Sequence, residues 1–367
     1  MNKNLPNDFL EELQSFLKSE FDKLGVVVMP DFFLDRLVDL NLDLKNFSES
    51  LWKVAKRKGG SIDGIAQTEL RGGNAINTAS ALAALGIRVT PIVCTSNLGL
   101  QLIRFYLKSQ KVNLSRIKIS EKLSITTAME FKTEKGKVNV MLRDMSGLTN
   151  FGSHSLDTVD FEAIENADYV CVFNWAGTRR FGTELAGTVF RRVKTKGKGK
   201  TYYDTADPTP NKEKIPELVK KVLQSRFVDI LSVNENEAIY YASLLSDEVK
   251  KRGKSLRLEE SAKESAKILA KHLSARVDLH TTNFSATFTK KGETIVPAFN
   301  VPVLRATGAG DAWNAGNILG DACKLSDGCR LALANAVAAY YISDPDGMHP
   351  TRKQLIKFCD KMKHETS

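Results

Sequence analysis

The sequence predicts an α/β fold built on a doubly wound sheet, and three observations support this. Short runs rich in β-branched residues, such as GVVVM at 25–29, have the length and composition of buried strands. Helix-like stretches separate most of these runs, and this alternation is typical of a sheet covered by helices on both faces. The chain has 367 residues, 42% of them hydrophobic, which is enough to bury the core that such a sheet requires.

The first elements follow from hydrophobic spacing. Residues 7–23 carry Phe and Leu at helical intervals and predict an amphipathic helix packed on the body. We therefore divide the chain into an N-terminal helical extension, 1–24, and one domain, 25–367. After the first strand, NTASALAALG at 77–86 predicts a helix ending at its final glycine, and VTPIVCT predicts the next strand.

A predicted hairpin interrupts the alternation of strands and helices. ITTAMEF and KVNVMLR are joined by the turn TEKGK, so we interpret residues 119–145 as a small β lid, with 61–71 supplying a further lid strand. Met129 and Phe131 alternate with Glu130, which predicts one apolar lid face. That face could cover a sugar ring, stack on a base or form a homodimer contact. Later strands are expected at DYVCVFN, KTYYDTA, VDILSVN and VDLHTTN.

The amino-acid composition restricts the classes of binding partner that we expect for the chain. The formal charge of +10 favours anionic ligands without identifying one. The basic stretch RRVKTKGKGK at 191–200 lacks interleaved aromatic residues, so we interpret it as a solvated helix end and expect no nucleic-acid partner. The five cysteines form no CxxC pair, and we find neither a signal peptide nor an apolar run of membrane-spanning length. These features predict a cytoplasmic protein with reduced thiols and no membrane partner.

The stretch ATGAGDAW at 306–313 combines a glycine loop with the start of a helix. Successive amides at Gly308, Ala309 and Gly310 could form a concave site for anionic oxygen, and the helix adds its positive end. Asp311 is then placed to accept a proton from a hydroxyl that attacks a phosphate. A tight turn with an aspartate cap is the alternative. The chain has no GxxxxGK[ST] loop and no GxGxxG after the first strand, so other nucleotide folds fit poorly.

With ATGAGDAW, five segments occur in the order found in the ribokinase-like PfkB carbohydrate kinase family, which the chain resembles over about residues 25–355. The other four are PDFFLDRLV, LRGGNAINTASALAALG, SVNENEA and LANAVAAYYISDPDGMHPT. The resemblance implies a central mostly parallel sheet flanked by helices, with a small β lid over the sugar. It also implies ATP-dependent, magnesium-assisted phosphorylation of a hydroxyl group, with Asp311 as general base and the 308–310 amides as anion hole.

The resemblance assigns further residues to the acceptor substrate. These are Asp31, Asp35, Gly72, Gly73 and Asn77. Carboxylates and an amide suit sugar hydroxyls because each hydroxyl both donates and accepts a hydrogen bond. The two aspartates could instead be plain helix caps after the first strand, and the asparagine could be an ordinary N-cap.

A second set of residues matches the nucleotide side of the family. It comprises Asp204, Asn234, Glu237, Thr282 and Asn335. The resemblance implies that Asn234 and Glu237 order the phosphates and Mg²⁺, with Glu237 acting on the metal through water. The alternative for that pair is a turn with a capping box, because the two residues stand at a strand end with capping-box spacing.

Three departures from the family concern substrate and cation. The family usually has Asp-Thr where this chain has Arg305-Ala306, and in relatives that aspartate belongs to a monovalent-cation site. Our hypothesis is that the Arg305 guanidinium replaces potassium, so that potassium is not required; an exposed arginine on an altered loop is the alternative. The segment LHTTNFSATF around Thr282 lacks the family's two glycines, and Pro30 replaces a glycine after the first strand.

These observations leave three functions in competition. A sugar or related carbohydrate kinase agrees with the most motifs, and a nucleoside kinase of the same fold is the nearest rival. A catalytically altered regulatory relative that binds nucleotide or sugar is the third, motivated by Arg305 and the missing glycines. Residues 39–60 form an insertion that could enlarge the substrate site or only decorate the surface.

Overall fold

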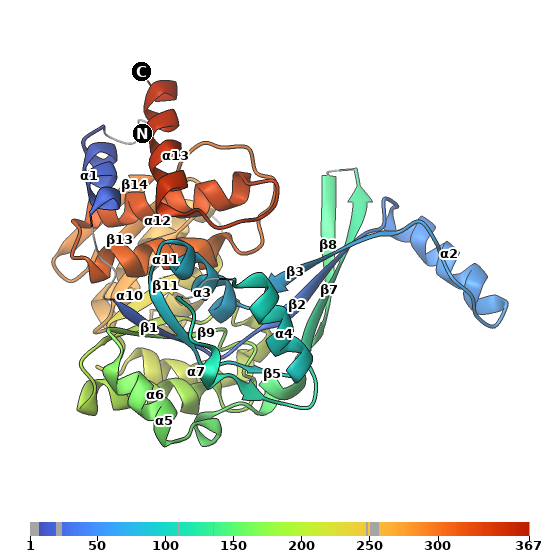
Figure 1. Ribbon diagram of the computed structural model, residues 1–367, viewed down its shortest axis with the longest axis horizontal. Coiled ribbons are helices and arrows are strands. Elements are labelled where there is room, and N and C mark those ends of the chain that lie inside the picture. The colour runs from blue at the N-terminus through green and yellow to red at the C-terminus, as the bar shows by residue number, and fades with distance from the viewer. Residues whose placement is uncertain are drawn as a thin grey trace.

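The main sheet of the computed structural model has eight strands in the order β14-β13-β12-β11-β10-β9-β1-β4 (Figure 1). Strands from β12 to β4 pair in parallel, whereas β13 and β14 are antiparallel additions at one edge. The predicted mostly parallel sheet is therefore confirmed. The strand bounds are β1 Gly25–Met29, β4 Arg88–Pro91, β9 Tyr169–Phe173, β10 Lys200–Asp204, β11 Ile230–Val233, β12 Arg276–His280, β13 Phe284–Thr289 and β14 Gly292–Pro297.

Helices cover both faces of this sheet. The structure describes residues 7–19, 24–108, 111–134, 136–246, 249 and 257–366, and residues 20–23 of the predicted first helix lie outside them. The helix bounds are α1 Asn7–Lys18, α2 Leu44–Lys56, α3 Asn74–Ala84, α4 Asn97–Tyr106, α5 Thr158–Asn166, α6 Gly182–Lys196, α7 Ile215–Leu218, α8 Glu235–Leu245, α10 Leu258–His272, α11 Ala309–Ala322, α12 Asp327–Ser343 and α13 Arg352–Thr366. The described helices include none that is long and apolar enough to cross a membrane.

Two hydrophobic cores result from the alternation of side chains along the strands. In β1, Val26 and Val28 join one buried cluster, while Val27 and Met29 join the other. The first cluster packs against α1, α3, α11 and α12, and the second against α6, α8 and α10. Burial on both faces explains why these strands read as continuous apolar runs.

The lid is a separate four-stranded sheet in the order β3-β2-β7-β8. Its bounds are β2 Phe33–Asp39, β3 Ala66–Gly72, β7 Ser124–Thr133 and β8 Gly136–Asp144. β3, β7 and β8 overlap the segments that we interpreted as lid, but β2 was not expected. The alternative that we gave for Asp35 was a helix cap, whereas residues 33–39 form a strand that pairs with both β3 and β7. VTPIVCT, predicted as one strand, forms β4 and the short β5 Cys94–Thr95, which pairs with β6 Lys118–Ile119.

The insertion at 39–60 contains α2, which stands at the end of the lid away from the main sheet (Figure 1). None of its residues is buried, and Trp52 is 70% exposed. One contact with the lid is an edge-to-face pair between Phe47 and Phe131, with ring centroids 5.7 Å apart. The insertion therefore extends the lid, and the homodimer contact that we predicted for the lid stays a prediction.

Candidate active site

The site lies where the N-termini of α3 and α11 meet the carboxyl ends of the parallel strands. α11 begins after Gly308, whose φ of 86° is left-handed and which would place a Cβ 2.7 Å from the Tyr341 hydroxyl. Only glycine fits there without strain. Helix geometry leaves the first amides of α11 without intrahelical acceptors, as the predicted anion hole requires. One of the three predicted amides is nevertheless used, because the Ala309 N–H donates to the Ala306 carbonyl at 3.2 Å.

Asp311 lies in the first turn of α11 and is held by two asparagines of α3. Asn74 Nδ2 donates to its Oδ1 at 2.8 Å, and Asn77 Nδ2 donates to its Oδ2 at 3.0 Å. The helix that carries both asparagines begins at Asn74 rather than at the predicted residue 77. Asn77 is therefore not an N-cap; the cap is Gly73, whose φ of 91° breaks the preceding strand.

Burial makes Asp311 a stronger base than an ordinary aspartate. Its side chain is almost enclosed, and this desolvation raises its pKa well above the usual value. The amide bonds from Asn77 and Asn74 lower the pKa in part, while the nearby carboxylate of Asp204 raises it. A carboxylate whose pKa lies closer to neutral accepts a proton from a hydroxyl more effectively.

Gly72, Gly73 and Asp35 form the predicted acceptor side at the root of the lid. A Cβ on Gly72 would lie 2.2 Å from the Asp35 carboxylate, and one on Gly73 would lie 2.9 Å from the Asp31 carbonyl oxygen. The two glycines thus allow the chains to approach closely. Asp35 is half-buried on β2, and desolvation raises its pKa to about 6, against the opposing effects of Thr126 and Arg143.

Asp31 has a structural position rather than an open one. It is fully buried, and its carboxylate accepts hydrogen bonds from the amides of Asn74 and Ala75 at 3.1 and 2.9 Å and from Asn174 Nδ2 at 2.7 Å. It therefore caps α3, which begins 43 residues further along the chain. The alternative that we gave, a cap on a helix directly after the first strand, was wrong, because β2 follows there. The structure offers no exposed face of Asp31 for the predicted substrate contact.

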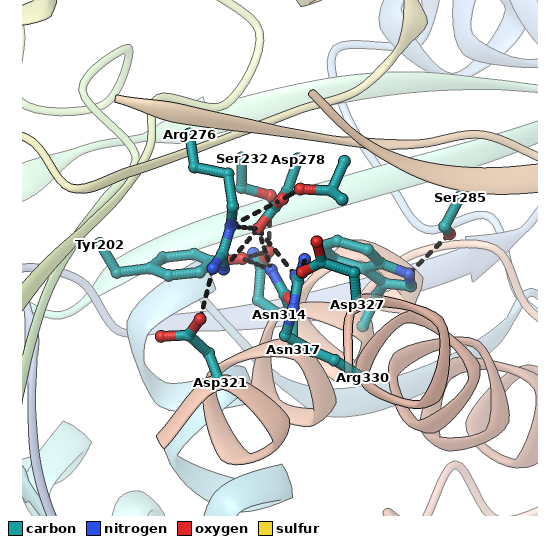
Figure 2. A network of polar contacts seen from close by, with 12 residues as sticks. Tyr202, Ser232, Arg276, Asp278, Ser285, Asn314, Asn317, Asp321, Asp327 and Arg330 are labelled. Carbon is teal, nitrogen blue, oxygen red and sulfur yellow. Dashed lines mark hydrogen bonds and ion pairs between the residues drawn. The ribbon is translucent and has the colours of Figure 1, made fainter. Parts of the chain in front are cut away.

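On the nucleotide side, Asp204 ends β10 and is tied to α11. Asn314 Nδ2 donates to Asp204 Oδ2 at 2.7 Å, and the Asn314 carbonyl oxygen accepts from Tyr202 and Ser232 at 2.7 and 2.8 Å. Figure 2 shows that Tyr202, Ser232 and Asn314 belong to a larger buried network of polar side chains. Because its oxygen and its nitrogen are both engaged, the Asn314 amide has one orientation and positions Asp204.

The network continues to a buried ion cluster (Figure 2). Asp278 on β12 is fully buried and pairs with Arg276 and Arg330 at 3.0 and 3.1 Å. Asn317 Nδ2 also donates to Asp278 at 2.9 Å, and Arg276 pairs further with Asp321. The cluster joins β12 to both α11 and α12, so it fixes the helix that carries the predicted base.

Asn234 and Glu237 form the capping box at the start of α8. The Asn234 oxygen accepts from the Glu237 amide at 3.0 Å, and the Glu237 carboxylate accepts from the Asn234 amide at 3.0 Å. Burial raises the pKa of Glu237 well above its usual value, and Asp204 raises it further. A capping box and a role with phosphate or metal are compatible here, because a cation would relieve the repulsion between these carboxylates. The described residues contain no preformed group of three metal-ligating side chains.

The two remaining nucleotide-side predictions lie in different places: Thr282 contacts the start of α8, whereas Asn335 lies in the core. Asn335 is buried in α12, where it donates to the Pro297 carbonyl at 3.0 Å and accepts from Ser285 and Trp313 at 2.5 and 3.0 Å. Because the amide nitrogen and oxygen both form hydrogen bonds within the core, the side chain is not open to a ligand. Thr282 is exposed beyond β12, and its amide donates to Glu235 at 3.3 Å.

Arg305 is half-buried and bridges two loops. Its Nη2 donates to the carbonyl oxygens of Asp344 and Pro345 at 3.1 and 2.7 Å. The guanidinium also lies over the Tyr341 ring, 5.9 Å from its centroid. These contacts differ from the exposed arginine that we gave as the alternative.

Sequence reasoning missed four residues of this region. Asn74 and Asn314 were hidden in helical stretches; Asn74 begins α3 directly after the double glycine, and Asn314 lies in the second turn of α11. Arg71 donates to the Gly347 carbonyl at 3.2 Å from the end of β3. His280 ends β12, and its ring lies tilted against Trp313 beside the start of α11, with centroids 5.0 Å apart. Its position directly before the altered segment TTNFSA was the signal available.

Comparison with known proteins identifies the family to which the chain belongs. The sequence profile of the pfkB family of carbohydrate kinases matches residues 38–354, which is most of the chain. The chain belongs to this family. No protein among the curated sequences matches the chain.

Solved structures show the ribokinase-like fold. Arabidopsis thaliana ribokinase, complexed with ribose and ATP, aligns with a TM-score of 0.68 and 18% identity over 92% of this chain and 99% of that one. A putative ribokinase II from E. coli, with ATP and Mg²⁺, aligns with a TM-score of 0.68 and 13% identity over 92% and 99%. A nucleoside kinase from Methanocaldococcus jannaschii aligns with a TM-score of 0.63 and 15% identity over 93% and 100%.

Proposed function

We propose that the protein transfers the γ-phosphoryl group of ATP to a hydroxyl of a sugar or related carbohydrate. The observation that carries the proposal is the placement of Asp311, a buried carboxylate held by Asn74 and Asn77 in the first turn of α11. Similarity to structures described with ribose and ATP, and with ATP and Mg²⁺, supports the same donor here.

In the proposed reaction, the acceptor hydroxyl lies between Asp35 and Asp311. Its proton passes to Asp311, its oxygen bonds to the γ-phosphorus, and the bond from that phosphorus to the bridging oxygen breaks to release ADP. Asn74 and Asn77 orient the carboxylate, so the base is in place before the acceptor arrives. The amides at the start of α11 stabilise charge on the transferred group.

Mg²⁺ would bind with the nucleotide near Asp204 and Glu237. The closeness of the two carboxylates supports this fit, since the negative charge of Asp204 raises the pKa of Glu237. When bound, the ion neutralises phosphate charge and orients the triphosphate. Asn234 and Asn314 supply the positioning, because each holds one of the two carboxylates.

The acceptor site is expected to respond to pH through Asp35. Its pKa of about 6 means that the carboxylate ionises between pH 5 and 7; the ionised form accepts hydrogen bonds from hydroxyls on both oxygens, whereas protonation makes one of them a donor. We expect the KM for the acceptor to fall as pH rises through this range, whereas Asp35→Asn should show a high, nearly pH-independent KM. Steady-state kinetics from pH 5 to 8 measure both. The exposed Asp39 of the same strand provides the control, Asp39→Asn, and a wild-type KM that does not vary with pH contradicts the assignment.

We propose further that Arg305 replaces a monovalent cation. Its bonds to the carbonyl oxygens of Asp344 and Pro345 support this, because such carbonyls also suit a potassium ion. The wild-type rate should then be the same within about twofold in potassium and in tetramethylammonium salts of equal ionic strength, since a fixed guanidinium supplies the charge. Arg305→Ala should be slower in both. A clear potassium requirement in the wild type would reject the proposal.

A panel of free sugars, sugar acids, inositols and nucleosides with MgATP tests the proposed function. Release of ADP that depends on a sugar or a related polyol supports it. Turnover with nucleosides alone would favour the second candidate, for which the fold of the M. jannaschii nucleoside kinase is the supporting similarity. Nucleotide binding without turnover of any acceptor would favour the regulatory alternative.

A further inference from the structure

His280 lies at the carboxyl end of β12, directly against the first turn of α11. A Cβ on Gly310 would be 3.3 Å from its Cε1 and 3.9 Å from its Nε2. The ring also contacts Trp313, with the two ring planes tilted by 37°. The edge of the imidazole that carries Nε2 therefore faces the helix start where the anion hole is expected.

The Nε2 atom of His280 is enclosed and has no hydrogen-bond partner among the described residues. An unpaired buried polar atom costs free energy, so such atoms in folded proteins usually find a protein group, a water or a ligand. At a helix N-terminus the ligand favoured by the local field is an anion, and phosphate oxygen is the commonest such group.

We propose that His280 is a nucleotide-binding residue whose Nε2–H donates to a phosphate oxygen of the donor at the start of α11. This inference rests on the proposed kinase function. It also accounts for the altered segment after His280: without two glycines to bring bare backbone to the phosphates, a side chain supplies the contact. The proposed contact requires the neutral tautomer that carries its hydrogen on Nε2, because a neutral imidazole donates only from the protonated nitrogen.

The surroundings of His280 keep it neutral in the free protein. Burial lowers its pKa, and this effect exceeds the opposing influence of the carboxylates of Asp204, Glu235 and Asp278. These three groups come from the strand ends and the α8 start around the ring. The neutral imidazole can therefore donate a hydrogen bond to a phosphate without first binding a proton.

Calorimetric titration of the full-length protein with MgATP and with MgGTP tests the proposal. In His280→Leu we expect the Kd for each nucleotide to rise by roughly 10-fold or more, because one charge-assisted hydrogen bond is lost. The KM for the nucleotide should rise while kcat changes little. In His280→Gln, whose side-chain amide keeps an N–H donor, most of the affinity should return. His272→Leu, which removes an exposed histidine of α10, should bind as the wild type does.

Several outcomes would overturn this assignment. Equal nucleotide affinity of the wild type and His280→Leu would show that His280 makes no contact with the phosphates. A loss of affinity confined to ATP or to GTP would show that the histidine contacts the nucleobase instead. Failure of His280→Gln to regain affinity, together with lowered melting temperatures in both variants, makes the role structural. If the wild type binds nucleotide but transfers no phosphate to any acceptor, the proposed function fails while the binding test still decides the role of His280. No nucleotide binding by the wild type overturns both.

Discussion

Asp311→Asn is expected to lower kcat by about 10²–10⁴-fold, the range typical of a lost general base. Asparagine has nearly the same shape but accepts no proton from the attacking hydroxyl. Both asparagines that hold Asp311, Asn74 and Asn77, lie at hydrogen-bond distance and can still contact the new side chain. Nucleotide affinity should stay within a few-fold of the wild type, because the amides of α11 are unchanged. Single-turnover kinetics with MgATP and the best acceptor, beside calorimetry, separate the two quantities.

The matched control is Asp63→Asn, which removes an exposed carboxylate from the segment that leads into β3. It should retain wild-type kcat. If Asp311→Asn lost less than about fivefold in kcat, far below what a general base contributes, the assignment of Asp311 as base would be wrong. A melting temperature well below that of the wild type would show that the substitution disturbs the structure. Hydrogen exchange at α3 measures whether the Asn74 and Asn77 contacts persist in the variant.

Asp278→Asn is expected to destabilise the protein by about 3–5 kcal/mol, the usual cost of removing one partner of a buried ion pair. Arg330 is 1% exposed and would lose its buried anionic partner, and Arg276 would keep only Asp321. Urea unfolding at pH 7 measures the change in the free energy of unfolding. A loss below about 1 kcal/mol would mean that the cluster contributes little to stability.

Asp327→Asn is the control for this cluster, because Asp327 pairs with the same Arg330 at 2.8 Å but is 47% exposed. An exposed pair contributes about 0–1 kcal/mol, so this variant should stay near the wild type.

The pH dependence of stability has a definite sign at Asp278. Burial alone would raise its pKa, but Arg276 and Arg330 lower it below that of an unfolded aspartate. The unfolded chain therefore binds the proton first, and the contribution of Asp278 is present above a pH of about 4 and is lost as pH falls toward its folded pKa. The wild type should lose stability more steeply than Asp278→Asn on acidification below pH 4.

Some features of the site were accessible from sequence and others were not. The glycine loop and the helix that follows it are local in the sequence, so the position of Asp311 at the start of α11 could be predicted. The strand expected directly before that loop was wrong, because the chain between β14, which ends at Pro297, and α11 forms no strand. Asn74, which is 237 positions away, became a partner of Asp311 only because α3 and α11 pack side by side. The β2 strand, which carries Asp35, was missed because its pairing partners, β3 and β7, are distant in sequence.

The sequence by itself determined the alternating strands and helices, the pfkB motifs and the residue types that phosphoryl transfer needs, because these depend on short-range patterns of side chains. The tertiary structure alone decided that Asp31 caps a helix, that Asn335 is sealed in the core, and that the unpartnered His280 faces the start of α11. Burial and hydrogen-bond partners depend on which distant segments pack together, and that packing is set by the whole chain.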